Sequence, residues 1–454
     1  MAVICEKICD TWLGSLQIAE VHKLKNFLDY LANNGKDLCL PTERNTFPLA
    51  LPVFSSRFAN ETHKAAKRIV ELAYIKYTQL YRGSPERLVK EAGMHPDSIS
   101  FFSSSDRTLK YLTSIARPDA IVSNGIAKFV ELNIDTAIGG MPECTLLPFW
   151  YLNSSIARIV VEIHEITATL PLRIMANFLQ KVAINEGLGS QPNLGILEFE
   201  YQTKVQHTFA SLMRSYGIPA VYANQDFVTE NDGYLHFNAK RLDIGLRCFS
   251  LEAIEFPKDL PYVESLIACT KKDTGTLLLS NGISALVSNK RILAHLSAAS
   301  DLSPEDERLV KNHLPWTREV RSGRVRYESQ SVELEDLLQE KSKFVLKPGY
   351  GEQGKGVIVG HSVTTSAWEE AVRLALESSD FCVQECVRGD TISLPFLSKD
   401  ETTVEVNQCP YVIGVYLIGE EPAGILVRLS RNREVSVLNY AQGAVVTCAL
   451  FSGS

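Results

Sequence analysis

The segment at residues 119–135, DAIVSNGIAKFVELNID, alternates apolar and polar side chains on both sides of Asn124-Gly125. An Asn-Gly pair between two such runs is a strong signal for a β-hairpin. In a hairpin the register decides which face each side chain occupies, and a slip of one residue turns every side chain to the opposite face. This segment therefore constrains both the fold and the position of the polar residues that it carries.

Asp119, Glu131 and Asn133 are the polar residues of this hairpin with functional interest. Glu131 and Asn133 are two residues apart, so they share a face of a strand. Asp119 joins that face only if it lies directly opposite Glu131, which the common two-residue Asn-Gly turn does not allow. We therefore predict a three-residue loop at 124–126 with Gly125 at positive φ, or another bulge that restores the phase. Three such oxygen-bearing side chains suit Mg²⁺; the alternative is a hairpin whose polar residues face water.

Several other segments have apolar residues at the spacing of an amphipathic helix. These predicted helices lie at 15–35, 60–83, 152–182, 203–216, 278–313 and 366–379. Period-two segments predict strands at NLGILEFE, IPAVYAN and FCVQECV, a second hairpin at DGYLHFNAKRLDIGLRCF, and a β-rich end from residue 403. Residues 325–341 are rich in charge, and we expect them to form a connector.

The order of helices and strands predicts an α/β (α+β) protein. Because 454 residues are too many for one ordinary core, we expect several regions. They are a helical N-terminal region at 1–100, the region with the first hairpin at 101–185, a small α/β unit at 190–270, and a region with a glycine loop and the β-rich end at 278–454.

The composition, 45% hydrophobic and 22% charged, is typical of a soluble globular protein. The net charge of −7 argues against electrostatic binding to nucleic acid. Because the sequence has no uninterrupted apolar run of about 18 residues and no signal-like start, we expect a cytoplasmic protein without a membrane partner. The ten cysteines include no C-x-x-C pair, which predicts reduced thiols and argues against a zinc site.

Residues 343–360, KFVLKPGYGEQGKGVIVG, place a glycine-rich loop between two apolar runs. Its glycines let the backbone approach a ligand closely and offer N–H donors to it. They include Gly349, Gly351, Gly354 and Gly356. Lys347 precedes the loop, where its ammonium group can reach a phosphate oxygen. The loop lacks the Ser or Thr of a Walker loop. It predicts a flap over phosphates, and the alternative is a solvated turn.

Two further segments carry groups that suit a nucleotide. FCVQECV, residues 381–387, could present backbone donors and acceptors to an adenine edge; the alternative is a core strand. GVYLIGEEPAGILVRLSRN predicts a hairpin with Arg428 beside a Pro-Ala-Gly turn. A guanidinium there can hold a phosphoryl or carboxylate group through two hydrogen bonds; the alternative is a surface arginine.

The order of these segments resembles the ATP-grasp ligases, specifically the circularly permuted type that includes glutathionylspermidine synthetase and related bacterial peptide ligases. In that type the metal-binding strands precede the lysine strands, as they do here. RPD at 117–119 and ELN at 131–133 match its Arg-x-Asp and Glu-x-Asn pattern, and SNKRIL at 288–293 resembles the segment of its first ATP lysine. The likeness touches most of residues 101–454. It implies an ATP-grasp fold with circularly permuted order, a helical N-terminal layer and a small α/β unit of the pre-ATP-grasp kind.

The resemblance also implies ATP and Mg²⁺ as cofactors, together with the residues that bind them. The metal ligands would be Asp119, Glu131 and Asn133. The residues that steady the transferring γ-phosphate would be Arg117 and Arg428. The other ATP-binding residues would be Lys290, Lys347, Gly349, Gly351, Gln353, Gly354, Gly356, Gln384, Glu385, Cys386 and Val387.

The implied activity is ligation of a small-molecule carboxylate to an amine. ATP would phosphorylate the carboxylate, and the amine of an amino acid or peptide would attack the acyl phosphate. Two alternatives remain: a ligase whose acceptor is a carrier-protein thiol or a larger peptide, and a nucleotide-binding protein without catalysis. No segment resembles the amidase domain of the bifunctional synthetases, so amide hydrolysis is not expected. Arg241 and Arg247 could bind a substrate carboxylate, or form structural salt bridges to Asp243 or Glu252.

Overall fold

The structure is a computed structural model of the chain. It describes residues 21–38, 40, 44–81, 84–91, 105–154, 157, 165–199, 203–255, 257–279, 282–351, 354–378, 380–419, 421–433, 435, 437–438 and 443–453.

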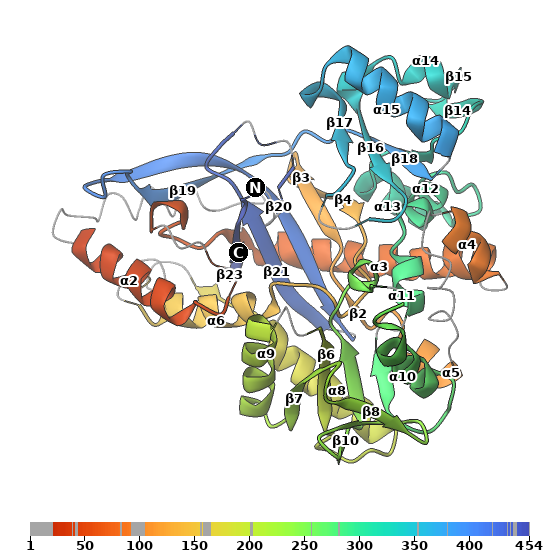
Figure 1. Ribbon diagram of the computed structural model, residues 1–454. Helices are drawn as coiled ribbons and strands as arrows, with labels where there is room; N and C mark the ends of the chain where they lie inside the picture. Colours follow the sequence, from red (N-terminus) through yellow and green to blue (C-terminus); the bar gives the residue numbers. More distant parts are fainter. Residues whose placement is uncertain are drawn as a thin grey trace.

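A seven-stranded sheet runs through the middle of the molecule (Figure 1). Its strands are β2 (Ile115–Ala116), β3 (Asp119–Ser123), β4 (Ile126–Glu131), β19 (Thr391–Leu397), β20 (Val404–Ile418), β21 (Glu421–Leu429) and β22 (Val445–Cys448). The order is β22-β21-β20-β3-β4, and β2 and β19 also pair with β20. The sheet therefore joins the first hairpin to strands that follow it by almost 300 residues in the sequence.

The β3–β4 hairpin has a two-residue turn, so the predicted three-residue loop is wrong. Ser123 pairs with Ile126, and Asn124 and Gly125 have φ values of 51° and 72°. Two positive φ values are typical of the type I′ turn, whose twist matches that of the flanking strands. The register then shifts between Asp119 and Ala120, and Asp119 pairs with Glu131. The alternative prediction, a bulge that restores the phase, is confirmed.

Helices α3 (Ser56–Tyr81), α6 (Met141–Leu152) and α8 (Pro171–Asn185) pack on this sheet. The long helix α3 contacts β20, and α8 contacts β20 and β21. Helix α6 contacts β21 and β22. The helix expected at 152–182 is not continuous: α6 ends at Leu152, and β5 (Ile166–Thr167) pairs with β23 (Leu450–Ser452) before α8 begins. Pro171 favours the first turn of a helix, which accounts for the start of α8 at this residue.

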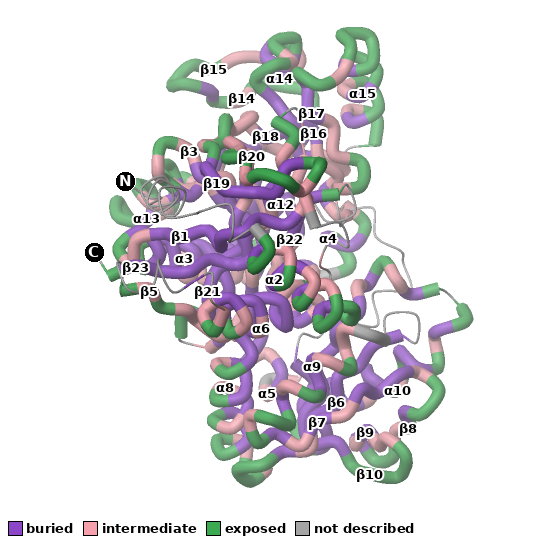
Figure 2. The backbone as a smooth tube through the Cα atoms, turned by 90° about the vertical axis from the view of Figure 1, so that its left-hand side faces the viewer, coloured by how far each residue is buried: buried purple, intermediate pink, exposed green. Residues whose placement is uncertain are grey.

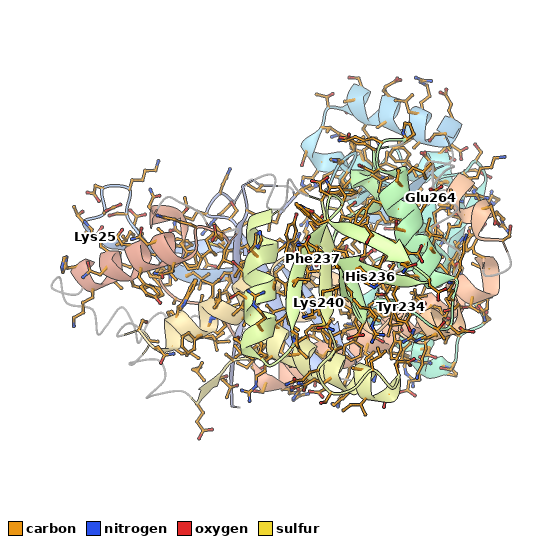
Figure 3. All side chains as sticks on the ribbon, turned by 60° about the horizontal axis from the view of Figure 1, so that its bottom comes forward. Lys25, Tyr234, His236, Phe237, Lys240 and Glu264 are labelled. Atoms are coloured by element: carbon orange, nitrogen blue, oxygen red, sulfur yellow. The ribbon has the colours of Figure 1, made fainter. Side chains whose placement is uncertain are left out.

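A second, parallel sheet forms the small α/β unit at the bottom of Figure 1. Its order is β12-β11-β6-β7, with strands β6 (Leu194–Glu198), β7 (Ala220–Asn224), β11 (Ile244–Arg247) and β12 (Leu277–Leu279). Helices α9 (Thr203–Ser215) and α10 (Leu260–Thr270) accompany it, with a small antiparallel sheet of β8 (Val228–Asn231), β9 (Tyr234–Phe237) and β10 (Lys240–Arg241). Figure 3 looks onto this side and labels Tyr234, His236, Phe237 and Lys240 on the small sheet.

A third sheet lies at the top right of Figure 1 and has the order β13-β18-β16-β17. Its strands are β13 (Thr317–Glu319), β16 (Phe344–Pro348), β17 (Ile358–Val359) and β18 (Phe381–Glu385), and α15 (Thr365–Ser378) packs against it. Buried Phe344, Leu346 and Trp368 belong to a hydrophobic core that is separate from the main one. We call this part the β16–β18 unit.

The expected connector at 325–341 is instead part of the β16–β18 unit. It forms the hairpin β14 (Arg324–Tyr327) and β15 (Gln330–Glu333), followed by α14 (Leu334–Leu337). The turn residues Glu328 and Ser329 have φ values of 44° and 71°. Apolar residues alternate with the charged ones in this segment. Tyr327 is buried in the separate core, and Val325 and Val332 pack against it.

The remaining elements complete the layers. They are α2 (Val21–Asn34), η2 (Arg44–Thr46), β1 (Val53–Ser55), α4 (Pro85–Glu91), α5 (Asp106–Leu109), η5 (Leu251–Ala253), α11 (Gly282–Val287), α12 (Lys290–Ser297), α13 (Pro304–His313), η6 (Lys341–Lys343), η7 (Gly360–Ser362) and β23 (Leu450–Ser452). The buried residues concentrate along the central sheet and α3, whereas many turns and helix surfaces are exposed (Figure 2). None of the helices among the described residues is long and apolar enough to cross a membrane.

Candidate functional site

Asp119 is the centre of a buried polar cluster on the seven-stranded sheet. The residue is 5% exposed. Arg117 Nε donates to Asp119 Oδ1 at 3.0 Å, and Arg428 Nη2 and Asn133 Nδ2 donate to Oδ2 at 2.7 and 3.1 Å. Burial raises the pKa of Asp119, but the charges of Arg117 and Arg428 outweigh it and hold the pKa below its usual range. The carboxylate is therefore ionised, and both predicted arginines contact it.

Gly414 makes room for this cluster. It pairs with Asp119 across β20 and β3. A Cβ atom at this position would lie 2.7 Å from Arg117 Cδ and 2.8 Å from Asp119 Oδ1, and the ion pair prevents either group from moving away. The sequence reasoning missed Gly414. The available signal was a glycine inside a strand, which often marks a close approach of another group.

Lys290 links the hairpin to the glycine loop. Its Nζ lies 2.9 Å from Glu131 Oε1 and donates to the Gly351 carbonyl at 2.8 Å. It is the first residue of α12, and its backbone N–H donates to the Gly349 carbonyl at 3.0 Å. Because Glu131 stands opposite Asp119, this ion pair places Lys290 beside the Asp119 cluster.

Lys347 reaches the same place from the end of β16. Its Nζ donates to the Val130 carbonyl at 3.2 Å and to Gln384 Oε1 at 2.6 Å. Val130 is the extra residue of the β3–β4 bulge, which takes it out of the regular pairing. Burial lowers the pKa of Lys347 to about 8, while nearby Glu131 opposes this change and Lys290 adds to it. The bulge thus sets the register of Asp119 with Glu131 and provides the Val130 carbonyl that accepts from Lys347.

In the segment expected to hold adenine, residues 384–387, most of the polar groups form hydrogen bonds within the protein. Gln384 is 3% exposed, and its side chain bonds Lys347 and, at 3.0 Å, Thr317 Oγ1. The side chain of Gln384 therefore holds Lys347. The N–H groups of Glu385 and Cys386 donate to the carbonyls of Trp316 and Lys343 at 2.8 and 2.7 Å.

Val387 differs from its neighbours in this segment. Within the described residues, its backbone N–H has no hydrogen-bond partner. The strand β18 ends two residues earlier, at Glu385, so Val387 lies beyond the regular pairing. Of the predicted adenine contacts, the Val387 N–H is therefore the donor that remains available to a ligand.

The glycine loop bends away from β16 and approaches the small α/β unit. Gly349 is closely packed, since a Cβ atom there would lie 2.8 Å from the Asp380 carbonyl oxygen. Gly351, Gly354 and Gly356 have positive φ values. Lys355 Nζ lies 3.7 Å from Glu252 Oε2 in the small unit. Gln353, also predicted to bind ATP, lies outside the described residues.

The site carries more positive than negative charge. Its cations are Arg117, Lys290, Lys347 and Arg428, and its carboxylates are Asp119 and Glu131. These groups come from the central sheet, from α12 and from the β16–β18 unit. Arg428 also has a buried Nε without a hydrogen-bond partner in the described part of the chain. Two surplus positive charges and an unsatisfied donor suit an anion with several oxygens.

The implied Mg²⁺ fits this donor set only in part. Lys290 contacts Glu131 Oε1, and Asp119 Oδ2 already accepts three hydrogen bonds. Asn133 directs its amide nitrogen at Asp119, so the expected convergence of its oxygen with the two carboxylates is not present. No group of three or more His, Cys, Asp and Glu residues suits a metal in the described ranges. These residues fit a Mg²⁺ ion that arrives with phosphate oxygens, because Mg²⁺ needs one or two carboxylates in such sites.

Arg241 and Arg247 lie in the small α/β unit and are both paired with carboxylates. Arg241 Nη2 lies 3.0 Å from Asp243 Oδ1, which is the structural alternative of the sequence interpretation. Its neighbour Lys240 is on the outer side of the unit (Figure 3). Arg247 is fully buried and pairs with Asp135, which the sequence reasoning did not consider. The expected partner Glu252 instead lies near Lys355.

No family profile and no curated protein sequence match this chain. Among solved structures, it is similar to a glutathione synthetase-like effector from Globodera pallida in its apo form. The TM-score is 0.59 at 11% identity, over 94% of this chain and 96% of that one. The chain shares its fold with that protein. A second solved structure, described as a gamma-glutamylcysteine synthetase from Methylobacillus flagellatus, is 13% identical over 89% of each chain. Its TM-score is 0.45.

Proposed function

We propose that this protein is an ATP-dependent carboxylate–amine ligase of the ATP-grasp type, with circularly permuted order. One observation carries the proposal. Four cations from the central sheet, from α12 and from the β16–β18 unit meet two carboxylates beside a glycine loop, which leaves a surplus of positive charge. The fold shared with a glutathione synthetase-like protein supports the same class of reaction. Its substrates would be a small carboxylic acid and an amine, such as an amino acid or peptide.

The triphosphate would lie among these cations. Lys290 and Lys347 would bind its oxygens, and the glycine loop would cover them with backbone N–H groups. Adenine would lie at the end of β18, where the Val387 N–H can donate to it. Lys290 would exchange the Gly351 carbonyl for a phosphate oxygen, so the loop would change its contacts when the nucleotide binds.

Phosphoryl transfer to the substrate carboxylate would occur beside Arg428 and Arg117. Their guanidinium groups would stabilise charge on the transferring phosphoryl group, and Asp119 would hold them in place. Asp119 and Glu131 would hold Mg²⁺, which would supply positive charge to offset that of the phosphate oxygens. The amine would then displace phosphate from the acyl phosphate and form the amide. The closed glycine loop would keep water from that intermediate.

This proposal assigns a role to each region of the chain. Residues 101–185 and 278–454 would together form the nucleotide-binding core. The unit at 190–270 would shape the substrate pocket, with residues 1–100 as a helical layer. The pair formed by Arg247 and Asp135 lies where β11 ends, so an acid substrate would bind Arg247 only by displacing Asp135.

Release of ADP tests the proposal. The purified protein is mixed with MgATP and a panel of carboxylic acids and amines, and ADP and phosphate are measured. Hydroxylamine in place of the amine should trap the acyl phosphate as a hydroxamate. Lys290→Ala should abolish ADP release, whereas Arg241→Ala, which removes an exposed arginine of the small unit, should not. If the protein binds MgATP but releases no ADP with any of the acids, it is a non-catalytic nucleotide-binding protein. A trapped thioester would indicate a thiol acceptor.

A further inference from the structure

Arg291 follows Lys290 in α12, but its side chain is directed into a different part of the molecule. It is 0% exposed. Its guanidinium forms an ion pair with Glu319 at the end of β13, and a second with Glu91 of α4, whose Oε2 lies 3.4 Å from Nη2. Arg291 Nη1 also donates to the Glu91 carbonyl at 3.1 Å. One buried side chain therefore ties the first turn of α12 to α4 and to β13.

The same first turn carries the groups of the candidate site. The Asn289 side chain caps α12 by accepting from Arg291 N–H at 3.0 Å. Lys290, one residue away, contacts Glu131 and the Gly351 carbonyl. The position of the Lys290 ammonium group therefore depends on the position of a turn that Arg291 holds.

Arg291 also contacts the start of the glycine loop. A Cβ atom at Gly349 would lie 3.3 and 3.4 Å from Cγ and Cδ of Arg291, so the arginine stem forms the surface against which Gly349 packs. Lys290 N–H donates to the Gly349 carbonyl from the same side. In the sheet, Glu319 pairs with Cys382, and Cys382 pairs with Lys347. Glu319, which pairs with Arg291, and Lys347 thus lie on either side of Cys382 across neighbouring strands of the sheet.

We propose that Arg291 is a positioning residue, which sets the places of Lys290 and of the glycine loop for binding the phosphates of ATP. The inference rests on the proposed function and deepens it, because it separates binding of the phosphates from binding of the nucleoside. A purely structural arginine would support the whole site equally. A positioning residue would support the phosphate contacts alone.

Calorimetric binding of MgATP and adenosine tests this difference. We expect Arg291→Lys and Arg291→Met to weaken MgATP binding at least about tenfold and to leave adenosine binding unchanged, since misplaced contacts of this kind cost about 10- to 100-fold. Arg87→Met is the matched control, because Arg87 also pairs with Glu91 but lies on α4 with an exposed side chain. It should leave the affinity for MgATP at the wild-type value.

A double-mutant cycle with Lys290→Met asks whether Arg291 acts through Lys290. We expect Lys290→Met combined with Arg291→Met to lose less MgATP affinity than the sum of the two single losses, because residues that act through one another are not additive. Additive losses, equal losses for MgATP and adenosine, or wild-type MgATP affinity in a folded Arg291 variant would each overturn the inference.

Loss of both buried ion pairs of Arg291 can prevent folding, so Glu319→Met provides a second route that removes only one of them. It releases Arg291 from β13 while the pair with Glu91 remains. We expect the same selective loss of MgATP affinity, and an unchanged affinity would overturn the inference. If the wild-type protein bound no MgATP, the proposed function itself would fail and this inference with it. MgATP binding that responds to Lys290→Met but not to the Arg291 and Glu319 variants would refute the inference alone.

Discussion

Raising the pH through 8 should weaken ATP binding, because Lys347 would lose its charge there. Burial lowers the pKa of Lys347 to about 8, so its ammonium group deprotonates as the pH rises through 8. A phosphate contact needs the charged form. The affinity for ATP should therefore be highest below pH 8. Above pH 8 it should fall about tenfold for each pH unit, since one pKa unit corresponds to about 1.4 kcal/mol. Lys347→Arg stays charged over this range and is the control.

The stability of the folded chain should change in the opposite direction. An unfolded Lys347 would keep its ordinary pKa of 10.5, so the unfolded state binds more protons than the folded state between about pH 8 and 10.5. Below pH 8 the buried charge costs the folded state about 3–4 kcal/mol, because the pKa of Lys347 lies about 2.5 below 10.5 and one pKa unit corresponds to about 1.4 kcal/mol. This cost should disappear as the pH rises from 8 to 10.5.

Two measurements on the same proteins check this reasoning. Titration calorimetry with MgATP at pH 7, 8, 9 and 9.5 gives the affinity of the wild type and of Lys347→Arg. Urea unfolding of the wild type and Lys347→Met over pH 7 to 10 gives the change in their stability difference, which removes the titration of all other groups. An ATP affinity independent of pH, or the same loss in Lys347→Arg, would refute the role of Lys347.

Three further substitutions test the Asp119 cluster. Gly414→Ala should lower stability by about 1–3 kcal/mol through overpacking and reduce ADP release, whereas Gly139→Ala, where a Cβ meets nothing within 4 Å, should not change the thermal midpoint. Asp119→Asn should destabilise the protein by about 3–5 kcal/mol at pH 7 because it leaves Arg117 and Arg428 without a carboxylate. Since the pKa of Asp119 is lowered, urea unfolding should show this difference persisting until the pH falls below the ordinary range of aspartate. Arg428→Met should reduce turnover about 10²- to 10³-fold with little change in MgATP affinity, and unchanged turnover would make Arg428 a structural residue.

Short-range preferences in the sequence determined the local elements. The Asn-Gly turn and the period-two pattern placed the first hairpin, and the apolar spacing predicted α3 and α15. The same patterns were ambiguous where charge concealed an apolar alternation, as at Val325 and Tyr327, and where Pro171 divided a run of apolar residues. The residues chosen as candidate site groups include Asp119, Glu131, Lys290, Lys347 and Arg428, and the structure brings these five together.

Only the tertiary structure decided how those residues meet. The local turn preference gives the wrong phase for Asp119, and a bulge at Val130, next to the pairing with β20, corrects it. The roles of Gly414 and Gln384 depend on strands that are far away in the sequence. Burial changes the pKa of Lys347, and no pattern of neighbouring residues measures burial. The physical reason is that turns and helices form from contacts over a few residues, whereas strand pairing and desolvation depend on groups almost 300 residues apart.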